Sequence, residues 1–117
     1  MGPILNLFNR KPTPDPRKLV RMVTDGEAVL IDVHEAGDWA AGHTKGAIHI
    51  PLATFRITTD PRSPECHPAL KNGKPVVLHC ASGARSNMAS GLLREFGHEA
   101  HNIGGLGHWQ AAGGGLA

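Results

Sequence analysis

Two short apolar runs constrain the fold of this chain most strongly. Residues 28–33 read AVLIDV and residues 76–80 read VVLHC, and glycine, proline or polar residues flank each run. A run that is short, β-branched and almost continuously apolar is typical of a strand that is buried on both faces. Residues 47–51 and 99–103 are expected to form two further strands. These runs together predict a mainly parallel central sheet.

Helical patterns alternate with these strands along the chain. A helix is expected to begin at Pro16, with Asp15 as its N-cap, because proline suits the first helical position. Residues 86–96 carry apolar side chains at helical spacing, which predicts a second, longer helix. Shorter helices are expected over residues 35–41 and 105–112. This alternation predicts an α/β domain whose sheet is flanked by helices.

The length and charge of the chain limit the classes of function. At 117 residues it has the length of one domain, which we divide into a lead-in (1–13), the domain itself (14–113) and a flexible tail (114–117). Lysine and arginine number 12 against 10 acidic residues, and no basic run is present, so no nucleic-acid partner is expected. The N-terminal residues lack the pattern of a signal peptide or membrane span. We therefore expect a cytoplasmic protein that does not bind membranes.

Cys80 is the strongest candidate for a catalytic residue. It follows the strand over residues 76–79 and precedes a loop of small residues, and ligands of parallel sheets bind outside the carboxyl ends of strands. Backbone N–H groups and the helix dipole favour an anion there, so the thiol pKa should fall below its usual value of ~8.5. Gly83 can adopt a positive φ that such a loop needs. The alternative is that Cys80 is a small buried apolar residue.

Three motifs occur in a characteristic order. They are LIDVHEAGDWAAGHTKGAIHIPL (residues 30–52), CASGARS (80–86) and IGGLGHW (103–109). Together they resemble the single-domain rhodanese family of sulfurtransferases. The resemblance implies that Cys80 attacks the outer sulfur of a donor such as thiosulfate, carries that sulfur as a persulfide and passes it to a thiol or cyanide. A protein could also be the sulfur acceptor.

The same resemblance implies a substrate-binding loop and no cofactor. Backbone N–H groups would stabilise the charged persulfide without a metal or an organic group. Arg85 has two readings, because its guanidinium fits either the oxygens of an anionic substrate or a structural carboxylate. The residues implied in substrate binding are Ala81, Ser82, Gly83, Ala84, Arg85 and Ser86.

The chain departs from the family pattern at two supporting positions. His34 stands where an arginine usually follows Asp-Val, and His43-Thr44-Lys45-Gly46 replaces the usual His-Ile-Pro-Gly. These changes put a salt bridge and a turn geometry in doubt, but not the nucleophile.

Several other residues have mainly structural interpretations. His79 adjoins Cys80, but successive strand side chains point to opposite faces, so His79 is expected in the core. Cys66 is expected to be a loop bystander, or alternatively to resolve the persulfide as a disulfide. HEAH (98–101) is one residue short of a zinc motif, so no metal site is expected. Structural roles, with the alternative of lining the pocket, are expected for Asp32, Asp38, Trp39, His43 and Trp109.

Two other functions use a similar loop. Related phosphatases and arsenate reductases also combine a thiolate with an arginine, but they place five residues between the two, whereas ASGA places four between Cys80 and Arg85. A non-catalytic sulfur-relay or docking module is the second alternative. The shorter loop favours sulfur transfer over phosphate chemistry.

Overall fold

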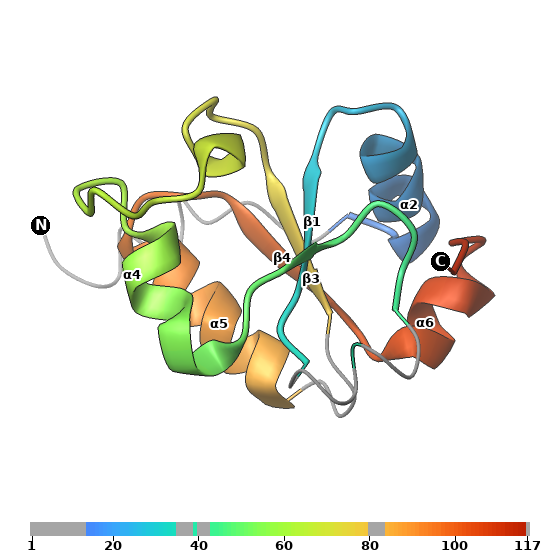
Figure 1. Cartoon of the computed structure of the whole chain (residues 1–117). Coiled ribbons are helices and arrows are strands. Elements are labelled where there is room, and N and C mark those ends of the chain that lie inside the picture. The colour runs from blue at the N-terminus through green and yellow to red at the C-terminus, as the bar shows by residue number, and fades with distance from the viewer. Residues whose placement is uncertain (1–13, 35–38, 40–42, 80–83, 117) are drawn as a thin grey trace, which may run out of the picture.

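A four-stranded parallel sheet forms the centre of the molecule. The computed structural model describes residues 14–34, 39, 43–79 and 84–116. The strand order is β2-β1-β3-β4, and every neighbouring pair is parallel. This arrangement confirms the predicted α/β fold class (Figure 1). The strands are β1 (Val29–Asp32), β2 (Ile48–His49), β3 (Val76–His79) and β4 (Ala100–Gly104).

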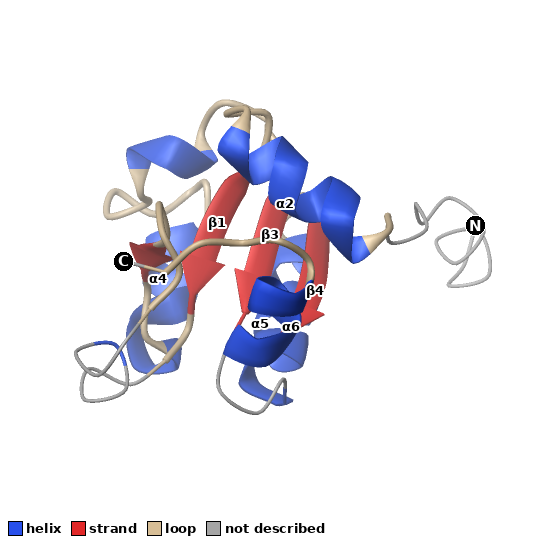
Figure 2. Ribbon diagram, turned by 90° about the vertical axis from the view of Figure 1, so that its right-hand side faces the viewer, coloured by secondary structure: helices blue, strands red, loops and turns tan. Residues whose placement is uncertain are grey.

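Helices cover both faces of this sheet. Helices α4 and α5 lie on one face, and α2 and α6 lie on the other (Figures 1 and 2). In the described part of the chain, no helix is long and apolar enough to cross a membrane. The α-helices are α2 (Pro16–Thr24), α4 (Phe55–Thr59), α5 (Ala84–Glu95) and α6 (Leu106–Ala111), and two short 3₁₀ helices span Leu52–Thr54 and Pro68–Leu70.

Helix α2 begins where the sequence predicts. The side chain of Asp15 accepts a hydrogen bond of 2.8 Å from the backbone N–H of Arg17, and Pro16 occupies the first helical position. The helix buries Leu19 and Val20 against the sheet. Gly26, with a φ of 75°, then turns the chain toward β1.

The apolar core forms two clusters, one on each face of the sheet. Ile31 and Leu78 belong to the cluster beneath α4 and α5, whereas Leu30 and Val77 belong to the cluster beneath α2 and α6. All four side chains are buried. Consecutive strand residues point to opposite faces, so a sheet covered on both sides needs the continuous apolar runs seen in the sequence.

Two expectations concern residues 35–41 and the C-terminal tail, which the structure describes only in part. The helix expected over residues 35–41 lies outside the described residues, apart from Trp39, which is helical. At the C-terminus, where a flexible tail is expected, the backbone oxygen of Gly115 accepts hydrogen bonds from Trp109 Nε1 (2.7 Å) and from the N–H of Lys45 (2.9 Å). A Cβ on Gly114 would overlap the Trp109 ring, so only glycine allows this close approach.

Candidate active site

The predicted nucleophile lies between two well-formed elements. Strand β3 ends at His79 and helix α5 begins at Ala84. Cys80 and three predicted substrate-binding residues, Ala81, Ser82 and Gly83, lie outside the described residues. The structure thus defines the strand end that precedes the loop and the helix start that follows it.

The first turn of α5 contains the other predicted binding residues, Ala84, Arg85 and Ser86. The first N–H groups of an α-helix have no acceptor within the helix, and the helix dipole makes this end positive. Arg85 is exposed, and both of its interpretations stay open. The end of α5 that follows the loop is therefore suited to an anion.

Ser86 is fully buried and connects α5 to β4 through a side-chain hydrogen bond. Its hydroxyl donates a hydrogen bond of 2.6 Å to Asn102 Oδ1, which also accepts one of 2.9 Å from the N–H of Gly104. Gly104 has a φ of +94°, and a Cβ there would lie 2.9 Å from Nδ1 of His108. The interaction between Ser86 and Asn102 spans 16 residues, so no local sequence pattern identifies Asn102. Ser86 thus has a structural role in addition to the binding role implied by the resemblance.

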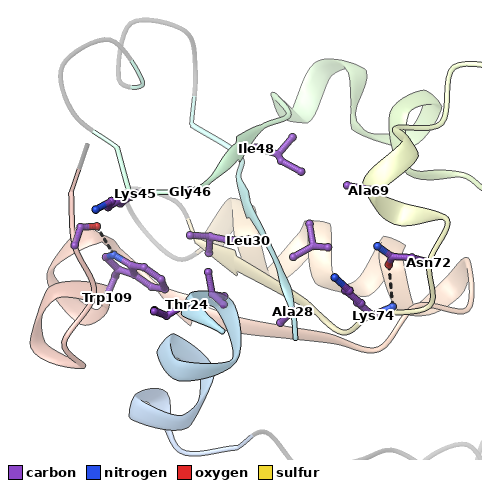
Figure 3. A pocket seen from close by; sticks show the side chains of 13 residues that line it. Thr24, Ala28, Leu30, Lys45, Gly46, Ile48, Ala69, Asn72, Lys74 and Trp109 are labelled. Atoms are coloured by element: carbon purple, nitrogen blue, oxygen red, sulfur yellow. Dashed lines mark hydrogen bonds between the residues drawn. The ribbon is translucent and has the colours of Figure 1, made fainter. Parts of the chain in front are cut away.

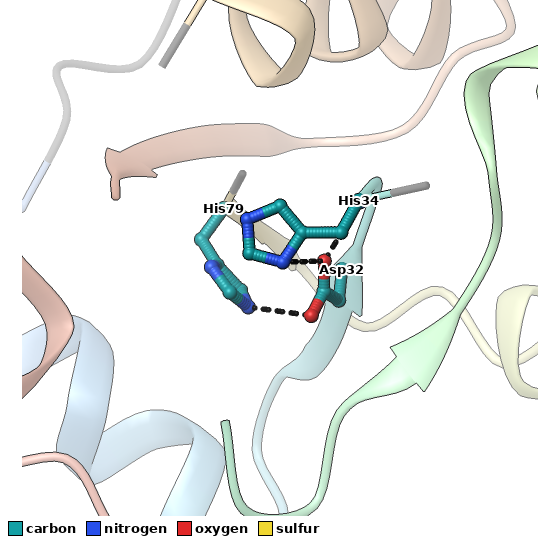
Figure 4. A group of neighbouring side chains, drawn as sticks. All are labelled: Asp32, His34 and His79. Carbon is teal, nitrogen blue, oxygen red and sulfur yellow. Dashed lines mark hydrogen bonds and ion pairs between the residues drawn. The ribbon is translucent and has the colours of Figure 1, made fainter. Parts of the chain in front are cut away.

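A buried polar cluster lies where β1 and β3 end (Figure 4). Asp32 Oδ2 lies 3.2 Å from Nε2 of His79, and Asp32 Oδ1 lies 3.1 Å from Nδ1 of His34. The backbone N–H of His34 donates a hydrogen bond of 2.8 Å to Asp32 Oδ1. Nε2 of His79 is also hydrogen bonded to the hydroxyl of Thr44, at 3.0 Å. The two departures from the family pattern, His34 and Thr44, both supply side chains to this cluster.

The electrostatics of the cluster favour an ionised Asp32. Burial by itself would raise the pKa of this carboxyl, but the His79 side chain, the backbone N–H of His34 and the two imidazoles together lower the pKa below its ordinary value. Asp32 and His79 are 0 % exposed, and His34 is 1 % exposed. The strands therefore end in a carboxylate held between two imidazole rings.

Stacked rings support the chain beside this cluster. The ring of Trp39 stacks on His43, with centroids 3.6 Å apart, and on His49, at 4.7 Å. Nε2 of His49 lies 2.6 Å from the backbone oxygen of His34 and bonds to it. Trp109 is buried in the cluster beneath α2 and α6. These contacts fit packing roles for Trp39, His43 and Trp109; Asp38 lies outside the described residues.

Cys66 belongs to the core rather than to an exposed loop. It is 4 % exposed and packs in the cluster beneath α4 and α5. Its Sγ lies 3.7 Å from the backbone oxygen of His67, to which it donates. The alternative role in resolving a persulfide depends on Cys80 and stays a prediction.

A cavity of about 470 Å³ lies at the other end of the strands (Figure 3). Thr24, Leu30 and Trp109 contribute to its wall, together with Lys45 and Lys74. Among the described residues, those that line it include none from β3 or α5. The cavity is thus separate from strand β3 and from the described residues of helix α5.

Comparison with known proteins identifies the family. The sequence model of the rhodanese-like domain matches residues 15–112. The chain belongs to the rhodanese-like domain family. A tRNA uridine(34) hydroxylase from Cronobacter sakazakii is 33 % identical over 87 residues, which are 73 % of this chain but only 24 % of the hydroxylase. The chain therefore spans about a quarter of the length of that curated relative.

Solved structures agree with this assignment of the rhodanese-like domain. The human single-domain sulfurtransferase TSTD1 is 28 % identical with a TM-score of 0.68, covering 86 % of this chain and 96 % of that one. A protein of unknown function from Rhodopseudomonas palustris, described as a candidate tyrosine phosphatase, has a TM-score of 0.77 at 24 % identity, covering 97 % of this chain and 90 % of that one. At that identity the second likeness shows the fold alone.

Proposed function

We propose that this rhodanese-like domain is a sulfurtransferase in which Cys80 carries the transferred sulfur. The thiolate of Cys80 attacks the outer sulfur of a donor such as thiosulfate. The sulfur–sulfur bond of the donor breaks, and sulfite leaves with the bonding electron pair. A thiol or cyanide then attacks the outer sulfur of the persulfide and releases the Cys80 thiolate. With cyanide the product is thiocyanate.

The observation that carries the proposal is the junction between β3 and α5. In the sequence, Cys80 stands between the end of the parallel strand β3 and the start of helix α5, and the start of a helix is its positive end. Such a position lowers a thiol pKa and stabilises negative charge on a sulfur. Ser86 fixes the first turn of α5 to Asn102, so its N–H groups keep their place when charge develops. The name of the related human protein, a sulfurtransferase, supports the same chemistry.

Phosphate chemistry is the nearest rival, and the length of the loop argues against it. Four residues separate Cys80 from Arg85. A phosphoryl group is tetrahedral and carries charge on several oxygens, so a loop that surrounds it needs a larger ring of N–H groups. One sulfur atom fits the shorter ring. The hydroxylase relative does not add a third candidate activity, because its name describes a protein about three times as long as this chain.

One purified wild-type sample tests the two chemistries directly. We expect incubation with thiosulfate to add the mass of one sulfur atom to the intact chain, and cyanide to remove it with release of thiocyanate. Hydrolysis of a small aryl phosphate should be negligible. The Cys80→Ser variant is the matched control for both assays.

The opposite pattern would overturn the proposal. Cys80-dependent release of phosphate, with no sulfur adduct under conditions that load a known sulfurtransferase, would assign the domain to the phosphatase class. Neither activity in a folded chain would favour a docking module.

A further inference from the structure

The ends of β1 and β3 bring three potential metal ligands together. Asp32 is the last residue of β1, His79 is the last residue of β3, and the two are register partners in the sheet. His34 follows Asp32 by two residues. One ligand atom from each side chain lies within 4.8 Å of the other two, and all three residues are buried (Figure 4). This cluster has no part in the proposed transfer of sulfur.

The spacing of these atoms fits a tetrahedral metal ion. Bonds of about 2.0–2.1 Å at the tetrahedral angle place ligand atoms about 3.3 Å apart. Oδ1 of Asp32 lies 3.1 Å from Nδ1 of His34, and Oδ2 of Asp32 lies 3.2 Å from Nε2 of His79, so each imidazole lies near this spacing from one of the two oxygens of the same carboxylate. One ligand atom from each of the three residues lies within 4.8 Å of the other two, so a bound ion would draw these atoms closer together.

Unsatisfied polar atoms point to a missing ligand. Nε2 of His34 and Nδ1 of His79 have no polar partner among the described residues, whereas Nδ1 of His34 and Oδ2 of Asp32 have only the ion-pair contacts within the cluster. Buried polar atoms are nearly always paired, and an unpaired one lowers the stability of the fold. A metal ion would accept lone pairs from the carboxylate and from one nitrogen of each imidazole ring.

The buried carboxylate of Asp32 also calls for a positive charge, which a metal ion would supply. A buried carboxylate needs a positive charge close by. In the described part of the chain, no lysine or arginine forms an ion pair with Asp32, and its close partners are two imidazoles. One proton on a ring or one metal ion could supply the charge. A metal ion differs from a proton because it binds all three side chains at once, and the carboxylate and the two imidazoles each offer it a ligand atom.

We propose that Asp32, His34 and His79 bind a divalent first-row transition-metal ion that ties the end of β1 to the end of β3. Two imidazole nitrogens and one carboxylate oxygen suit zinc and its neighbours, whereas calcium and magnesium prefer oxygen ligands alone. The role of the ion is structural: it fixes the strand end from which the loop of Cys80 departs. Sequence reasoning misses this site because the ligands come from two strands and have no motif spacing.

The test uses the full chain with Cys80→Ser, which removes a thiolate that could itself bind zinc. The protein is stripped with a chelator, mixed with zinc sulfate, and separated from free metal by gel filtration. Elemental analysis should find about one zinc per chain, and zinc should raise the melting temperature because it binds the folded state.

Substitutions and spectra then locate the ion. In the same background, His34→Gln or His79→Gln should weaken zinc binding at least about tenfold, whereas His108→Gln, at an exposed position on α6, should leave it unchanged. NMR spectra of the histidine rings give a second readout that needs no substitution. Zinc should shift the resonances of His34 and His79 first.

Three outcomes would overturn the proposal. The first is a folded chain that retains no zinc and shows no change in melting temperature. The second is zinc that shifts only exposed histidines such as His108, which would mean adventitious surface binding. The third is zinc affinity that survives both His34→Gln and His79→Gln. If either variant fails to fold, the stoichiometry and the ring resonances of the Cys80→Ser chain still decide the question.

Discussion

Strands β1 and β3 change character along their length. Their amino-terminal halves, which pair Val29 with Val76 and Leu30 with Val77, are apolar. Their carboxyl ends pair Asp32 with His79, and these two residues are as deeply buried as the valines of β3. Because burying a carboxylate costs free energy that an apolar side chain does not, packing alone cannot explain the polar end.

Each of these two strands thus has an apolar half that packs in the core and a polar end that lies next to the candidate site. The apolar halves carry the core clusters on both faces. The polar end of β3 comes directly before the loop that we propose to carry the chemistry, since Cys80 follows His79 in the sequence. Four predictions test whether the two parts of the strands have these separate roles.

The largest expected effect is at the two cysteines. Cys80→Ser should abolish formation of the sulfur adduct and release of thiocyanate, because an alcohol cannot form a persulfide. Cys66→Ser should retain transfer per folded molecule, but it should lose about 1–3 kcal/mol of stability because it buries a hydroxyl in the core. Intact-mass spectra and urea unfolding measure the two effects. Loss of transfer in folded Cys66→Ser protein would instead indicate a two-cysteine relay.

Next in size is a change in the apolar core. Leu78→Ala should lower the free energy of unfolding by about 2–5 kcal/mol, because it leaves a cavity beneath α4 and α5. Sulfur loading of the molecules that remain folded should change little. Urea unfolding measures the first quantity and intact mass the second. A selective loss of loading at unchanged stability would break the proposed division of the strand.

Asp32→Asn should have a smaller effect that depends on pH. The pKa of Asp32 is lower in the folded state than in the unfolded state. Its ionised carboxylate therefore stabilises the fold above the unfolded pKa of about 3.9, and this stabilisation is lost as the pH falls through the folded pKa. The variant should be about 1–3 kcal/mol less stable at neutral pH, and the gap should narrow below about pH 4. Urea midpoints of the wild type and of Asp32→Asn, taken from pH 7 to 3, measure this difference in stability.

The matched control is Asp60→Asn. Hydrogen bonds from Arg62 also lower the pKa of Asp60, but this pair lies at the surface, where ion pairs contribute little. Its unfolding curve should follow that of the wild type at each pH. A gap for Asp32→Asn that stays constant across the range would show that the charge of Asp32 is not what stabilises the fold.

Arg85 should give the smallest of the four effects. Arg85→Ala should reduce kcat/KM for thiosulfate by about tenfold, the size of one charge-assisted hydrogen bond, and Arg85→Lys should restore part of it. Steady-state kinetics and a thermal melt are measured on the same samples. A lower melting temperature with unchanged kinetics would assign Arg85 to a structural carboxylate.

Much of the fold follows from local patterns in the sequence. Asp15 and Pro16 define the start of α2, the apolar spacing of residues 86–96 predicts α5, and the run of residues 76–79 predicts β3. Each of these signals acts over a few residues, through a capping hydrogen bond or the periodicity of one element. The stretch between β2 and β3 lacks such periodicity, and its short helices were not predicted.

Sequence alone determined the family, the alternation of strands and helices, and the placement of Cys80 after a strand, because each depends on residues close together in the chain. Only the tertiary structure brought Asp32 beside His79, Thr44 beside the same ring, and Asn102 beside Ser86. These pairs join segments 16 to 47 residues apart, and the parallel sheet, in which β3 pairs with both β1 and β4, brings those segments together. Asp32, Thr44 and His79, which are far apart in the sequence, thereby form one buried polar cluster.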